Sequence, residues 1–232
     1  LETARQLSAA GVRRIVLVGR NKQRGATAAA AVPGAVFEPC DANDPEQCKR
    51  LVERVEETNG AIDILVNTTA PEVLPALFFN QSAEEISRTL KEIALPPIYL
   101  CAAALPFMRN RRSGVIINLA SDAAKAATPG ESVIGAGMAA IVMFTRTLAM
   151  EVKRDGIRAN VITPSLIEGT LTGERVTREG FSAKLFAKAA SMAHLGVAQP
   201  EDIASLAVFL ASPAAARITG QAVSVNGGIS AA

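Results

Sequence analysis

Short, continuous apolar runs separated by helical stretches dominate this chain of 232 residues. Runs of this kind, without a polar residue at every second position, are typical of strands in a parallel sheet that is covered on both faces. The runs span residues 14–19, 35–40, 62–67, 115–119, 159–163 and 221–225. Because helical stretches alternate with them, the sequence predicts an α/β fold, with a doubly wound parallel sheet in three α/β/α layers.

The helical stretches carry their own start signals. Pro45 behind Asp44 fits the first helical position behind a capping residue. Helices are expected at about residues 1–10, 23–32, 45–58, 82–110, 132–153 and 200–211. A polar, glycine-containing region at 166–196 is expected to hold short helical pieces and to act as a mobile lid. With no repeat or linker in the sequence, residues 1–232 are interpreted as a single domain.

Composition excludes several classes of protein. The formal charge is +2, both signs are interspersed, and there is no Trp and only one Tyr, which argues against nucleic-acid binding. No apolar run reaches the roughly 18 residues that span a bilayer, so no membrane segment is expected. The three cysteines lack metal-ligand spacing, so no metal site is expected. They are interpreted as core residues of a reduced, cytoplasmic protein.

The chemistry is expected in residues 114–154. There a buried strand ends in Ser121-Asp122, a small-residue loop carries Lys125, and a helix rich in Gly and Ala follows. Open α/β sheets bind their ligands beyond the carboxyl ends of the strands. The segment after Ser121 is therefore the candidate site.

Several segments, in order, resemble the short-chain dehydrogenase/reductase family along nearly the whole chain. They are Gly19-Arg20-Asn21, Cys40-Asp41, Asp63 to Asn67, Ile117 to Ser121, Gly156 to Pro164, Pro200 to Ala204 and Ile218 to Gly228. The resemblance implies a Rossmann-type domain and an oxidoreductase that uses a nicotinamide cofactor. It also implies a first strand and a glycine-rich turn upstream of Leu1, over roughly 15–20 residues.

The resemblance assigns cofactor contacts residue by residue. The implied cofactor-binding positions are Arg20, Asp41, Ala42, Asn67, Thr69, Pro164 and Ile167. Arg20 favours NADP, with NAD as the other possibility, because a guanidinium can meet the 2′-phosphate. Two motifs depart from the family pattern: Asn67-Thr-Thr-Ala70 replaces Asn-Asn-Ala-Gly, and Ser165 replaces a glycine.

The catalytic positions depart further. The family uses a Ser, a Tyr 13 residues later and a Lys four residues beyond that. Ser121 is present, but the later positions hold Ile134 and Met138, and residues 92–94 contain no Asn where the family usually has one. Neither Ile134 nor Met138 can carry a proton. Loss of a well-placed general acid typically costs about 10²–10⁴-fold in rate.

Other polar residues could border the pocket. Asp122, Lys125, Glu131 and Ser132 lie on the loop after the strand, and Asp122 with Lys125 is interpreted as an exposed loop pair. Tyr99 is expected in a packing or interface position. His194, in the lid region, is expected to be solvated.

Three functions stay open at this point. The first is an NADP(H)-dependent oxidoreductase acting on the carbonyl or alcohol of a small-molecule substrate, with the proton handled by Ser121, water or the substrate. The second is a catalytically inactive homologue that serves as a cofactor-binding or structural partner subunit. The third is a non-redox lyase or isomerase.

The resemblance also implies a homo-oligomer, a dimer or tetramer, formed through helices 82–110 and 132–153. Small residues on the second of these helices would let helices approach closely. They are Gly135, Ala136, Gly137, Ala139 and Ala140.

Overall fold

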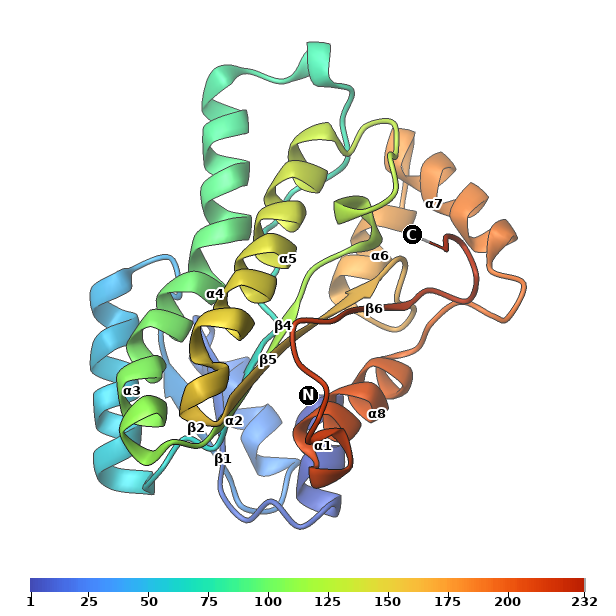
Figure 1. Cartoon of the computed structure of the whole chain (residues 1–232). Helices are drawn as coiled ribbons and strands as arrows, with labels where there is room; N and C mark the ends of the chain where they lie inside the picture. The colour runs from blue at the N-terminus through green and yellow to red at the C-terminus, as the bar shows by residue number, and fades with distance from the viewer. Residues whose placement is uncertain (232) are drawn as a thin grey trace.

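The computed structural model describes residues 1–231 and shows a parallel α/β architecture (Figure 1). The strands are β1 (Ile15–Gly19), β2 (Ala35–Pro39), β3 (Ile64–Asn67), β4 (Gly114–Leu119), β5 (Ile157–Pro164) and β6 (Ala222–Val225). The helices are α1 (Glu2–Ala9), α2 (Lys22–Ala30), α3 (Pro45–Asn59), α4 (Ala83–Arg111), α5 (Ser132–Val152), α6 (Leu171–Thr177), α7 (Gly180–Met192) and α8 (Pro200–Ala211). The predicted fold class is confirmed.

The strands form two parallel sheets rather than one. β1 pairs with β2, and the other four strands run in the order β3-β4-β5-β6. Within residues 1–231, β1 and β3 are not hydrogen-bonded to each other. Val18 of β1 is 44% exposed, far more than is usual for a strand in a covered parallel sheet. The sheet is thus interrupted between β1 and β3.

Two helical layers cover the strands and join the two sheets. In Figure 1, α3, α4 and α5 lie along one face, and α1 and α8 lie along the other. One apolar cluster joins Val16 of β1 to Leu65 of β3 beneath α3, and another joins Ile15 to Ile64 beneath α1 and α8. Burial on both faces explains why the strands are continuously apolar.

The predicted start signals are present. The Asp44 carboxylate accepts hydrogen bonds from the backbone of Glu46 and Gln47, at 2.9 and 3.1 Å. Ser82 and Glu85 form a capping box at the start of α4. Most element boundaries lie within two residues of those expected from the sequence.

β5 begins two residues earlier than expected, at Ile157, and β3 begins two residues later, at Ile64 instead of residue 62. The Ile62 amide donates to the Glu56 carboxylate at 2.9 Å, and the Ile62 carbonyl accepts from the Arg111 guanidinium at 3.1 Å. Side chains therefore satisfy the backbone groups that the strand ladder would otherwise use.

Two helices, α4 and the continuous helical span 132–155, are long and apolar enough to cross a membrane by length and composition alone. In the structure they pack against each other, and both contact the strands β3, β4 or β5. Their hydrophobicity is therefore accounted for, in part, by their place as a covering layer of the sheet. The core helix of a soluble protein passes the same compositional test.

The region predicted as a lid contains α6 and α7, which pack against each other beside the carboxyl ends of β5 and β6 (Figure 1). Arg175 of α6 forms an ion pair of 3.6 Å with Glu72, which lies on the segment after β3. The Phe181 ring of α7 packs against Gly130. The lid helices therefore contact both loops that flank the candidate site.

Candidate functional site

Ser121 follows β4 at the carboxyl edge of the larger sheet, as the sequence predicts. It caps a short 3-10 turn, η2 (Asp122–Ala124), and its hydroxyl oxygen accepts a hydrogen bond of 3.2 Å from the Ala123 amide. The side chain is half-buried. Because the hydroxyl accepts this bond, its own proton remains available for donation to a ligand oxygen.

Ile134 and Met138 lie in an apolar cluster. Both are half-buried and pack against Ile93 of α4, Ala120 at the end of β4 and Val161 of β5. The places where the family has Tyr and Lys are thus part of a hydrophobic wall, which neither donates nor stabilises a proton.

The interpretation of Asp122 and Lys125 as an exposed loop pair is wrong. Asp122 is only 5% exposed. Its carboxylate accepts hydrogen bonds from Asn226, from the Ser230 hydroxyl at 2.9 Å and from the Ser224 hydroxyl at 3.3 Å. These partners follow or belong to β6, about a hundred residues further along the chain. A buried carboxylate thereby fastens the C-terminal segment to the turn that Ser121 caps.

Lys125 contacts the same network. Its half-buried ammonium donates to the Ser224 hydroxyl, which also lies 3.4 Å from the Thr163 hydroxyl of β5. Asp122 and Lys125 are therefore linked through Ser224 rather than by a direct ion pair. Both are used in holding η2 on β5 and β6.

Asn67 ends β3 inside the protein. Its side-chain amide donates to Asn118 of β4 at 2.8 Å, and Asn118 donates in turn to Thr145 of α5 at 2.8 Å. The Asn67 side-chain oxygen is buried and has no hydrogen-bond partner among the described residues. These hydrogen bonds link β3, β4 and α5 next to the site.

Cys101 lies beside this hydrogen-bonded chain, and burial raises the pKa of its thiol to about 12.

Arg20 and Asp41, expected to contact the adenosine end of a cofactor, line one open groove of about 950 Å³. Arg20 is exposed directly after β1. Asp41 is half-buried after β2, and its carboxylate accepts from the Asn43 amide at 3.0 Å and the Asn43 side chain at 2.9 Å. Asp41 thus shapes a turn as well as facing the groove.

Ala42, beside Asp41, is half-buried, and its carbonyl accepts a hydrogen bond of 3.6 Å from the Cys48 thiol. Burial is the largest cause that raises the pKa of Cys48 to about 12. An un-ionised thiol at the start of α3 is a packing group rather than a nucleophile. Ala42 therefore belongs to the apolar cluster beneath α3.

The remaining expected contacts lie along the same edge. Thr69 is half-buried on the segment after β3. Pro164 is buried as the last residue of β5, and Ile167 packs against the apolar cluster beneath α8 while pairing with Ala198. Thr170, on the same edge, caps α6: its hydroxyl accepts a hydrogen bond from the Gly173 amide and donates one to the Ile167 carbonyl, both at 2.9 Å.

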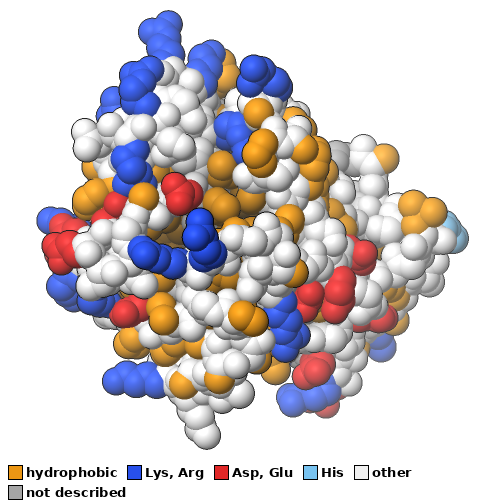
Figure 2. Space-filling view, turned by 90° about the horizontal axis from the view of Figure 1, so that it is seen from below, with side chains coloured by type: hydrophobic (Ala, Val, Ile, Leu, Met, Phe, Trp, Pro, Cys, Tyr) orange, Lys and Arg blue, Asp and Glu red, His pale blue; other side chains and the backbone are white. Residues whose placement is uncertain are grey.

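Tyr99 and His194 lie away from Ser121. Tyr99 packs on the cluster that contains Cys40 and Cys48, and its ring lines the groove with Arg20. His194 is exposed after α7, and Figure 2 shows this single His at the edge of the molecule. In the same view both signs of charge are scattered between hydrophobic side chains.

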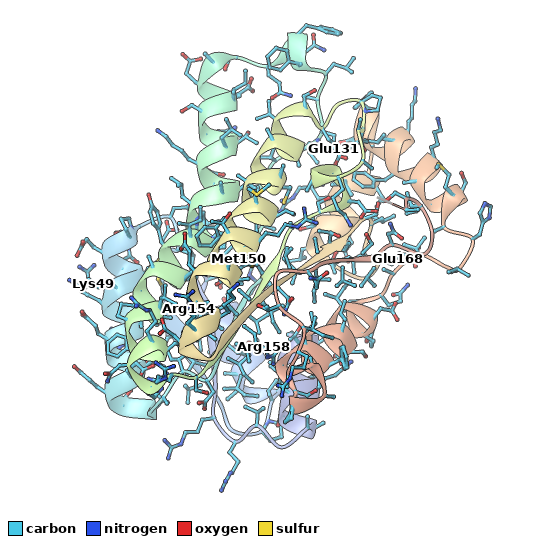
Figure 3. All side chains as sticks on the ribbon, viewed as in Figure 1. Lys49, Glu131, Met150, Arg154, Arg158 and Glu168 are labelled. Atoms are coloured by element: carbon cyan, nitrogen blue, oxygen red, sulfur yellow. The ribbon has the colours of Figure 1, made fainter. Side chains whose placement is uncertain are left out.

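Sequence reasoning named Glu131 as a loop residue and gave it no role. It precedes α5, and burial raises the pKa of its carboxyl above the ordinary value, with the Thr128 hydroxyl as the opposing hydrogen-bonding neighbour. Figure 3 shows Glu131 at the start of α5, on the side toward α6 and α7. Phe181 and Ala76, which are distant in sequence, contact the neighbouring Gly130, so no local motif could have revealed this environment.

Parallel strands between helical layers, with polar side chains gathered at the carboxyl edge, define a Rossmann-type fold. A family model described as enoyl-(acyl carrier protein) reductase matches residues 1–230. The 3-oxoacyl-[acyl-carrier-protein] reductase FabG of Chlamydia pneumoniae is 31% identical over 215 residues, which are 91% of this chain and 84% of the relative. Carbonyl reductase family member 4 of Danio rerio is 30% identical over 219 residues, which are 93% of this chain and 87% of that relative.

A solved structure of a short-chain type dehydrogenase/reductase from Mycobacterium ulcerans is also similar. Its TM-score is 0.89 at 25% identity, with 98% of this chain and 84% of that chain covered. The protein belongs to the short-chain dehydrogenase/reductase family of oxidoreductases.

Proposed function

We propose that the protein is an NADP(H)-dependent reductase of carbonyl compounds that works without the family's Tyr and Lys. The observation that carries the proposal is the arrangement of polar side chains at the carboxyl ends of the strands. Ser121 is held there with a hydroxyl proton to donate, and Arg20 and Asp41 share one groove. The substrate class follows relatives named as 3-oxoacyl-[acyl-carrier-protein] and carbonyl reductases.

The groove fits the phosphorylated adenosine end of the cofactor. Beside Arg20 it is lined by Arg88 and Lys91 of α4 and by the acidic residues Asp41, Glu84 and Glu92, and none of the three cations forms an ion pair among the described residues. Arg20, which directly follows β1, is the cation placed to meet a 2′-phosphate, and this phosphate distinguishes NADP from NAD. Tyr99 offers an aromatic surface in the same groove.

The chain's own residues supply the rest of the reaction. The cofactor, when bound, provides a hydride for the carbonyl carbon. Ser121 donates its hydroxyl proton in a hydrogen bond to the carbonyl oxygen and stabilises the charge that develops there. The apolar wall of Ile134 and Met138 excludes water from that side of the carbonyl.

Calorimetric titration with NADPH and NADH tests the cofactor assignment. We expect NADPH to bind at least about tenfold more tightly, since each tenfold corresponds to roughly 1.4 kcal/mol, within the range of one charge-assisted contact. Arg20→Ala should remove most of that preference, whereas Arg13→Ala, an exposed arginine before β1, should not. Failure of both cofactors to bind at millimolar concentration would contradict the proposal.

A second candidate function is a catalytically inactive partner subunit. It is favoured by one observation, the apolar packing of Ile134 and Met138. The variant Ile134→Tyr/Met138→Lys separates the two functions. If the unaltered protein binds NADPH but reduces no carbonyl in a broad panel until both side chains are restored, the inactive-partner function is correct.

We also propose that the protein is a cytoplasmic homo-oligomer that assembles through α4 and α5. Ala136, Ala140, Met143 and Met150 are exposed along one stripe of α5, at helical spacing. The two glycines of α5 do not have the role in subunit contact that the sequence suggested. A Cβ on Gly135 would lie 2.6 Å from the Ala123 carbonyl oxygen, and one on Gly137 would lie 2.9 Å from the Ile93 side chain. These glycines serve contacts within the subunit.

A further inference from the structure

We propose that Glu131 is the general acid that replaces the missing tyrosine. The inference rests on the proposed reductase function and names a residue for its open step, the delivery of a proton to the carbonyl oxygen. It is carried by the position of Glu131, by its contacts and by the state of its carboxyl group.

Glu131 is held against the turn that Ser121 caps. The Gly135 amide donates to the Glu131 carbonyl at 2.6 Å, which closes the first turn of α5. That turn touches η2 so closely that a Cβ on Gly135 would meet the Ala123 oxygen. Ser121, the cap of η2, and Glu131, the cap position of α5, therefore stand at the starts of two elements that pack against each other.

Two other segments close over this position. The Ala76 amide, on the segment after β3, donates to the Gly130 carbonyl at 2.8 Å. Phe181 of α7 packs on Gly130 from the lid. Glu131 itself is half-buried, and burial raises the pKa of its carboxyl. A raised carboxyl pKa is the property that a carboxylic acid needs to act as a proton donor near neutral pH.

The Glu131 carboxyl has the Thr128 hydroxyl as its hydrogen-bonding neighbour. Glu131 stands at the N-cap of α5 but makes no side-chain capping bond, and it forms no ion pair among the described residues. The charged side chains on the adjoining elements are Glu72, Asp122, Lys125, Glu174, Arg175, Arg178, Glu179, Lys184 and Lys188. None of them is a cause of the shifted pKa of Glu131.

The other candidate donors are committed elsewhere. The Asp122 carboxylate accepts three hydrogen bonds, and Lys125 is bound to Ser224. His194 is exposed beyond α7, and Tyr99 packs on the far side of α4 from α5. Glu131 is the remaining acid beside the turn.

The proposed reduction conserves atoms and electrons. When bound, the reduced cofactor would supply a hydride to the carbonyl carbon, and the π electron pair of the carbonyl would move to oxygen. The O–H bond of the Glu131 carboxyl breaks, and its proton joins that oxygen to give the alcohol. The resulting carboxylate takes a proton from water before the next turnover.

A first test needs neither cofactor nor substrate. The folded protein should hold the Glu131 proton at pH values at which the unfolded chain, near the ordinary pKa of 4.5, has released it. Stability should therefore fall as pH rises through that window. Glu131→Gln should unfold at a higher temperature than the unaltered protein at pH 8, and the difference should vanish below about pH 4. Glu57→Gln, an exposed change on α3, should show no such trend.

The second test measures reduction of a carbonyl panel with NADPH. Glu131→Gln should lower kcat by about 10²–10⁴-fold, and the alkaline limb of the pH profile should disappear with it. Adding Ile134→Tyr and Met138→Lys to Glu131→Gln should restore activity, which a merely misfolded site would not allow. If the unaltered protein is active and the Glu131→Gln variant is equally active, the role of Glu131 is overturned while the proposed function stands. An unaltered protein that reduces nothing would overturn the proposed function as well.

Discussion

At the scale of single residues, the chain keeps the polar side chains that build the site and has lost those that move a proton. Ser121 and Asn67 occupy their expected places, while Ile134 and Met138 have become core residues. Asp122 is the residue that distinguishes this site most. A buried carboxylate is stable only when hydrogen bonds satisfy it, and here Ser224, Asn226 and Ser230 provide them.

Replacing Asp122 tests that network. Asp122→Ala should lower the free energy of unfolding by about 3 kcal/mol, because several buried donors lose a charged acceptor. Urea denaturation measures the change. Asp122→Asn, which keeps the volume and one acceptor oxygen, should cost less, and Asp63→Ala on the surface should cost almost nothing. An equal, small effect at all three changes would show that the network does not stabilise the fold.

At the scale of elements, nearly every strand and helix could be predicted from the sequence, because hydrophobic period and capping residues are local signals. Asp44 and Ser82 begin their helices as local rules require. The site was less predictable. The contacts of Asp122 with β6 and the desolvation of Glu131 depend on segments far away in the chain, and no local pattern reports them.

The glycines of α5 are a further case in which a contact between segments distant in sequence was not predicted. Their sequence pattern suggested an interface between subunits, whereas Gly135 lies against η2. Gly135→Ala should destabilise the protein by about 1–3 kcal/mol, since the new methyl group collides with backbone, and it should reduce any activity by displacing Ser121. Thermal unfolding of this variant beside Ala136→Ser, an exposed neighbour, measures the effect. Similar stability of the two variants would contradict the packing described for Gly135.

At the scale of the whole molecule, the exposed apolar stripe on α5 is the surface through which we propose that two subunits pack. Met143 and Met150 are 60% and 61% exposed on a helix that otherwise covers the sheet. Met143→Glu combined with Met150→Glu should convert the oligomer to monomers at micromolar concentration, because like charges would meet across the helix pair. Light scattering measures the mass. Leu195→Glu, on the exposed tip after α7, should leave the oligomer intact.

The whole fold is also consistent with the proposed reductase, in which the family's tyrosine and lysine are absent. The parallel sheet places the Arg20 groove, Ser121 and Glu131 along the carboxyl edges and loops, where hydride and proton can come from separate sides. The central claim is that hydride transfer persists on this altered site.

Deuterium transfer tests that claim most directly. The protein is incubated with NADPH deuterated at the nicotinamide C4 position and a panel of 3-oxoacyl thioesters and simple ketones, and the alcohols are analysed by mass spectrometry. The account predicts alcohols that carry one deuterium at the former carbonyl carbon, with transfer from only one of the two C4 positions. Bound NADPH with no deuterium in any product, while the Ile134→Tyr/Met138→Lys variant transfers it, would contradict the account.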